Sequence, residues 1–130
     1  MFIEGMEGMD MTVKRVAAVI EDASLHKIGD LFKRKPKGLK LNETEALVVK
    51  AKTADGIAAS RIFFFCLKPD GTFDEESIAR DGSRFRRHRL GAFLRHYGIV
   101  SDTEDYNIRD DIGGWKGKAV DLHEGTIYVP

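Results

Sequence analysis

The sequence has 130 residues, of which 42% are hydrophobic and 32% are charged. This length favours a single domain, and this composition excludes an intrinsically disordered chain. The 21 Lys and Arg residues balance the 21 Asp and Glu residues, so the formal net charge is zero and the chain is not a polycation. Any binding of nucleic acid must therefore depend on how the charges are distributed along the sequence.

The single cysteine, Cys66, excludes an intramolecular disulfide and a multi-cysteine zinc site. No apolar run approaches the roughly 20 residues that a membrane helix needs, and the N-terminus lacks the pattern of a secretory signal. We therefore expect a cytoplasmic protein without a membrane partner. Residues 1–11 contain four methionines and no apolar period, which predicts a loose N-terminal tail followed by a single domain over residues 12–130.

The domain begins with a predicted strand and a predicted helical segment. β-Branched residues over 12–20 favour a strand, although a helical stripe also fits this segment. Apolar residues at helical spacing predict a short helical segment over 24–34. A basic arm over 33–40 follows, and because Pro36 and Gly38 interrupt it, we expect a loop there.

The remaining elements are a hairpin, a helix and two short strands. Residues 45–53 and 59–68 predict two strands joined by a tight turn at 54–56. Residues 83–97 carry an apolar stripe with period 3.6 and predict one long helix. Two further short strands are expected over 116–124 and 125–130.

The predicted elements follow the order strand, strand, strand, helix, strand, strand. This is the order of the five-stranded oligonucleotide-binding (OB) barrel, in which a helix lies between the third and fourth strands. We therefore expect a mainly β fold of the α+β class, namely a five-stranded OB-like barrel with one long helix.

The three consecutive phenylalanines of the 59–68 strand suggest a binding face. If Ile62, Phe64 and Cys66 point inward, Phe63 and Phe65 project outward beside Lys50 and Lys52. Aromatic and cationic side chains on one sheet face are what base stacking and phosphate contact require. The alternative is that both faces of the strand are buried.

Two other segments complete the predicted interface. The basic arm can follow phosphates or remain a solvated loop. Trp115, a loop aromatic, can contact a base or close the mouth of the barrel. The candidate nucleic-acid-binding residues are Lys33, Arg34, Lys35, Lys37, Lys50, Lys52, Phe63, Phe65, Trp115, Lys116 and Lys118.

The predicted helix is rich in arginine, but the acidic segment 102–111 is close in sequence, so we expect intramolecular pairing there, with direct contact to nucleic acid as the alternative. The search for catalytic residues gives no pattern. The four histidines lack metal-ligand spacing, and no serine lies in a nucleophile motif. We therefore expect a protein that is not an enzyme and has no metal or cofactor.

Several local motifs add a family resemblance. They are Ile20-Glu21-Asp22-Ala23, the Asp55-Gly56 turn, Arg61-Ile62-Phe63, the LRHYGI segment at 94–99 and Gly117-Lys118. In this layout the chain resembles the OB-fold single-stranded-DNA-binding proteins of phages and mobile elements. The resemblance implies sequence-tolerant binding of single-stranded nucleic acid, with DNA favoured over RNA. It also implies contacts from Lys50, Lys52, Phe63, Phe65 and Trp115.

An interaction or assembly module is the alternative function. In that case the phenylalanine-rich strand would form a homo-oligomer interface, and nucleic acid would have no role.

Overall fold

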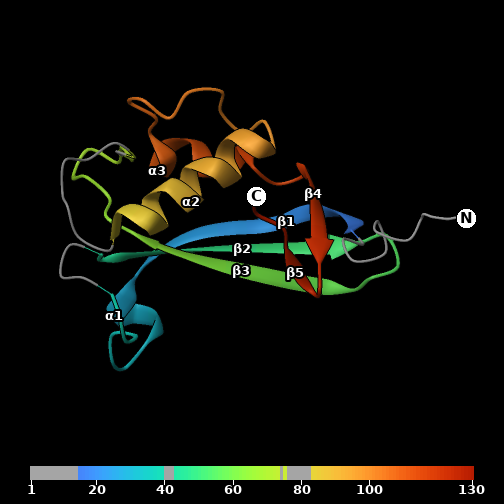
Figure 1. Ribbon diagram of the computed structural model, residues 1–130, viewed down its shortest axis with the longest axis horizontal. Coiled ribbons are helices and arrows are strands. Elements are labelled where there is room, and N and C mark those ends of the chain that lie inside the picture. Colours follow the sequence, from blue (N-terminus) through green and yellow to red (C-terminus); the bar gives the residue numbers. More distant parts are fainter. Residues whose placement is uncertain (1–14, 40–42, 74, 76–82) are drawn as a thin grey trace, which may run out of the picture.

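The structure is a computed structural model that describes residues 15–39, 43–73, 75 and 83–130. Its centre is a five-stranded antiparallel sheet with the strand order β3-β2-β1-β4-β5 (Figure 1). The predicted tail over residues 1–11 lies outside the described residues. The strands are β1 (Arg15–Lys27), β2 (Glu45–Thr53), β3 (Ala58–Phe65), β4 (Ala119–His123) and β5 (Thr126–Ile127).

The sheet curls into a nearly closed barrel because β5 approaches β3. Nη1 of Arg61 on β3 donates a hydrogen bond of 3.0 Å to the carbonyl oxygen of Ile127 on β5. Oγ1 of Thr126 donates a hydrogen bond of 3.3 Å to the carbonyl oxygen of Ser60. These two bonds join the ends of the sheet. The expectation of a mainly β fold with five strands is thereby confirmed.

The first strand is longer than the sequence predicted. β1 spans 13 residues and pairs with β2 along one edge and with β4 along the other. The predicted helical segment over 24–34 is wrong for its first part, because β1 continues to Lys27 and only α1 (Ile28–Leu31) is helical. Pairing of Leu25 with Leu47, and an ion pair of 2.5 Å between Lys27 and Glu45, extend the ladder there. These tertiary contacts outweigh the local helical spacing.

The expectation of one long helix also needs correction. The described residues contain three α-helices, α1, α2 (Ser83–His96) and α3 (Ile108–Asp111), and only α2 exceeds one turn. A 3-10 helix, η2 (Ile112–Gly114), follows α3. The element order therefore contains, besides α1, two short helices between α2 and β4 that were not expected. The side chain of Asn107 accepts a hydrogen bond of 3.0 Å from the backbone of Asp110 and caps α3. Within the described ranges, no helix has the length and apolar character needed to cross a membrane.

The core lies between α2 and the inner side of the sheet. Leu90, Phe93 and Leu94 of α2 are fully buried, which confirms the apolar stripe predicted for the helix. The ring centroids of Phe93 and Phe63 are 5.0 Å apart, and Phe65 is also completely buried. Figure 1 shows α2 over one side of the sheet and α1 on the other side. The core therefore lies on the side of the sheet that α2 covers.

Candidate nucleic-acid interface

The pairing of β2 with β3 decides which aromatic side chains face outward. Phe63 lies opposite Leu47 and Phe65 lies opposite Glu45, so both rings share the inner side with the core. Their exposed fractions are 5% and 0%. The prediction that Phe63 and Phe65 project outward is wrong. The alternation was right but its phase was reversed, because Phe63 packs against Phe93 of α2.

The outward positions of β3 belong to Ile62 and Phe64 instead. Ile62 is 41% exposed and lies opposite Val48, whereas Phe64 is half-buried. Lys50 and Lys52 are exposed on the neighbouring strand, as predicted. We call the surface away from α2 the outer sheet face; it includes Val19, Asp22, Val48, Lys50, Lys52, Ser60, Ile62 and Phe64.

The basic arm begins at one end of the outer sheet face. The ring centroid of Phe32 is 5.8 Å from that of Phe64. Farther along the arm, Nη2 of Arg86 on α2 donates a hydrogen bond of 3.0 Å to the carbonyl oxygen of Gly38, and the same guanidinium pairs with the buried Glu43. These contacts hold the arm at the start of α2. The arm residues Lys33, Arg34, Lys35 and Lys37 are all exposed.

An apolar groove of about 600 Å³ adjoins the other end of the outer sheet face. Ala17, Val19 and Ala119 contribute to its walls, and Lys52 and Lys116 bring ammonium groups to it. The backbone of Gly117 donates a hydrogen bond of 2.9 Å to the carbonyl oxygen of Ile20, which fixes the loop before β4 against β1. The groove therefore combines an apolar surface with two cations and the carboxylate of Glu21.

Acidic side chains partly balance the lysines of the outer sheet face. Nζ of Lys52 lies 3.3 Å from Oε2 of Glu21, and both side chains are about half exposed. Asp22 lies opposite Lys50 in the strand register. Exposed ion pairs of this kind contribute little free energy, so these contacts hold the two lysines only weakly.

Trp115 does not offer its ring to a ligand. It is 1% exposed, and its indole nitrogen donates a hydrogen bond of 3.0 Å to the hydroxyl of Tyr106. Burial and a hydrogen bond to Asp111 raise the pKa of Tyr106, so the hydroxyl stays protonated. The prediction that Trp115 contacts a base is wrong, and the alternative of a buried plug describes its position. Of its neighbours, Lys116 is exposed and Lys118 is half-buried.

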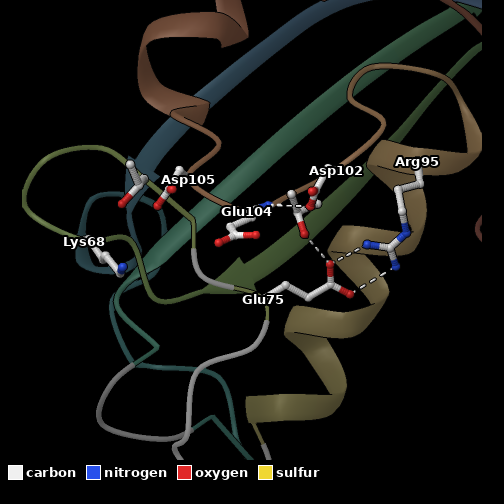
Figure 2. Close-up of a pocket in the computed structure, with 8 residues that line it drawn as sticks. Lys68, Glu75, Arg95, Asp102, Glu104 and Asp105 are labelled. Carbon is white, nitrogen blue, oxygen red and sulfur yellow. Dashed lines mark hydrogen bonds and ion pairs between the residues drawn. The ribbon is translucent and has the colours of Figure 1, made fainter.

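A second cavity, of about 560 Å³, lies beside α2 (Figure 2). Its central group is the carboxylate of Glu75, which is 4% exposed. Arg95 donates hydrogen bonds of 2.5 and 3.1 Å to its two oxygens, and Thr103 donates one of 2.7 Å. Burial acts to raise the pKa of Glu75, but these hydrogen bonds hold it below its usual value. The carboxylate is thus ionised and hydrogen-bonded to Arg95 and Thr103, and this arrangement indicates a structural role.

The rim of this cavity is mostly acidic and repels phosphate. Asp102, Glu104 and Asp105 are exposed around it, against Lys68 and Arg95. In the ranges that the structure describes, no three His, Cys, Asp or Glu side chains are grouped to hold a metal ion. A serine–histidine hydrogen bond of 2.8 Å joins Ser24 and His26 on β1. A nucleophile pair also needs a third group that orients the base, and among the described residues the imidazole of His26 has no second hydrogen-bond partner.

The outer sheet face, the basic arm and the apolar groove form one surface on the described chain, and sequence reasoning found its lysines but missed Ile62, Phe64, Phe32 and Val19. No local signal in the sequence would have found Ile62 and Phe64, because the facing of β3 depends on the tertiary contact between Phe63 and Phe93 of α2. No protein-family model, curated protein or solved structure matches the chain.

Proposed function

We propose that the protein is a cytoplasmic, non-catalytic module of the OB type that binds single-stranded nucleic acid without sequence preference. One observation carries the proposal: Lys50 and Lys52 share a single sheet face with the exposed apolar side chains of Ile62 and Val19. The lysines neutralise phosphates and release counterions, while the apolar side chains contact bases and sugars.

The dimensions of the surface support a strand of several nucleotides. From Lys52 to the position opposite Phe64, β2 advances six residues, which corresponds to roughly 20 Å. The groove beyond Val19 and the arm beyond Phe64 extend the surface at both ends. One OB barrel covers about 4–16 nucleotides, and this surface falls within that range.

The predicted contacts are to phosphates and to the faces of bases. Such contacts position a strand but do not distinguish one base from another. We therefore expect sequence tolerance, and the resemblance to phage proteins favours DNA over RNA. Equal-length thymidine and uridine strands measured side by side test this preference.

The test is fluorescence anisotropy of a labelled strand of about 20 nucleotides at low and at physiological salt. We expect wild-type binding to weaken with salt, and the double variant Lys50→Ala/Lys52→Ala to lose roughly tenfold or more in affinity, because two phosphate contacts are removed. Lys68→Ala, beside the acidic cavity, is the matched control and should bind like wild type. If wild type causes no anisotropy change at low salt with tens of micromolar protein, the proposal is wrong.

Self-association through β3 is the second candidate, favoured by the exposure of Ile62. Phe63 and Phe65 lie in the core, so such an interface has only Ile62 and the half-buried Phe64 to offer from the phenylalanine run. An apolar interface persists at high salt. A dimer mass at high salt that Ile62→Lys converts to a monomer mass would favour this candidate.

A further inference from the structure

The first half of α2 presents an exposed aromatic ring among cations. Phe85 is 68% exposed, more than any other large hydrophobic side chain in the described chain. The guanidinium carbon of Arg89 lies 6.0 Å from the centroid of its ring. Arg84 and His88 line the same shallow hollow, and Nε of Arg84 is 3.5 Å from Nε2 of His88. A ring in this position does not contribute to the core.

The charges around Phe85 call for an anionic partner. The sequence of α2 contains no acidic residue. Arg86 and Arg95 are neutralised by Glu43 and Glu75, but Arg84 and Arg89 form no ion pair with any described residue. Arg61 on β3 lies close enough to this helix to be affected by its charge: burial, and after it the nearby charge of Arg89, lower the pKa of Arg61.

The basic arm connects this part of α2 with the outer sheet face. Arg86, next to Phe85 in sequence, donates its hydrogen bond to Gly38 in the arm. At its other end, the arm contacts Phe64 through Phe32. In Figure 1 the arm after α1 and the start of α2 lie at the same end of the barrel. Cationic side chains therefore continue from the sheet, along the arm, to α2.

We propose that the first half of α2 is a second contact for the same single strand, in which Phe85 stacks on a base and Arg84 and Arg89 bind the flanking phosphates. This inference rests on the proposed function and extends its site beyond the barrel. An exposed ring flanked by guanidinium groups is the arrangement that binds single strands by stacking and cation–π contact. The continuity of cations with the arm favours nucleic acid over an acidic protein segment as the occupant.

The experiment compares a short strand with a long one. Labelled thymidine strands of about 6 and about 20 nucleotides lie near the lower limit of the OB site sizes and beyond their upper limit. The short strand is covered by the outer sheet face, whereas the long strand also reaches α2. The variants are Phe85→Ala, which removes the ring, Phe85→Tyr, which keeps it, and Arg89→Gln. Ile57→Ala, which truncates another exposed apolar side chain in the β2–β3 turn, is the control.

We expect Phe85→Ala and Arg89→Gln to weaken binding of the long strand by about fivefold or more, the size expected for losing one stacked base or its charged neighbour. Their affinity for the short strand should equal that of wild type, and Phe85→Tyr and Ile57→Ala should bind both strands normally. Unchanged affinity of Phe85→Ala for the long strand would overturn this inference while leaving the proposed function intact, and would point to a protein occupant. Failure of wild type to bind either strand would overturn the proposed function itself.

Discussion

At the scale of single residues, Gly91 and Glu75 show how closely α2 fits the segment before it. A Cβ atom placed on Gly91 would lie 2.1 Å from Oε1 of Glu75, far inside contact distance. That carboxylate is buried and held by Arg95 and Thr103, so it cannot move without breaking hydrogen bonds. The glycine is therefore required by space rather than by backbone conformation.

This packing predicts that Gly91→Ala lowers the free energy of unfolding, opposite to the usual effect of this substitution in a helix. Alanine normally stabilises a helix by about 1 kcal/mol relative to glycine. Here Gly91→Ala should destabilise the protein by roughly 1–3 kcal/mol, because displacing Glu75 breaks hydrogen bonds to a charged group. In a Glu75→Ala background the space is open, and the same substitution should stabilise the protein. Urea unfolding of the four proteins measures both effects, and equal signs in the two backgrounds would contradict the account.

At the scale of elements, the sequence predicted the β2–β3 hairpin correctly, but not which side chains of β3 point toward the core. The predicted strand over residues 45–53 coincides with β2, because its alternation and its turn are local signals. Both Phe63 and Phe64 are aromatic, so no local signal distinguishes inward from outward. The phase depends on Phe93, thirty residues later in the chain, which packs on Phe63. The same limitation explains β1, whose extension to Lys27 depends on pairing with β2.

Because Phe63 faces the core and Ile62 faces outward, substitutions at these two positions should affect stability and binding differently. Phe63→Ala should destabilise the protein by about 3–5 kcal/mol, as expected for a truncated core aromatic. Ile62→Ala should change stability by about 1 kcal/mol or less, because its side chain is partly exposed, but should weaken binding of a single strand. Thermal unfolding and anisotropy on both variants check this. The reverse order of stabilities would restore the phase first expected from the sequence.

At the scale of the whole molecule, zero net charge conceals a separation of charge. The arm and the lysines of the outer sheet face lie on one surface, whereas Glu75, Asp102, Glu104 and Asp105 surround the cavity beside α2. Composition alone could not reveal this, although the basic arm and the lysines were recognisable as candidates. The run of basic residues was enough to predict an exposed arm from the sequence. The buried position of Trp115 could not be predicted in this way, because it depends on tertiary contacts with Phe93 and Tyr106.

The separation predicts the salt dependence of binding. Each phosphate neutralised on a single strand contributes about 0.7 to the slope of log affinity against log salt. Replacing Lys33, Arg34, Lys35 and Lys37 by serine should therefore reduce the magnitude of the slope by up to about 3. Anisotropy titrations at several salt concentrations measure it, with Lys68→Ser as the control. A slope unchanged by the four replacements would show that the arm is only a solvated loop.

The closure between β3 and β5 has a consequence for motion. Two hydrogen bonds, each from a side chain to a carbonyl oxygen, span this seam, and β5 itself is only two residues long. Local opening begins where few backbone bonds must break, so amide hydrogens of β5 should exchange with solvent well before those of β2, which has strand neighbours on both sides. A strand bound across β1, β2 and β3 does not cross the seam. The barrel can therefore open locally at its seam, and a strand bound across β1, β2 and β3 would keep its contacts.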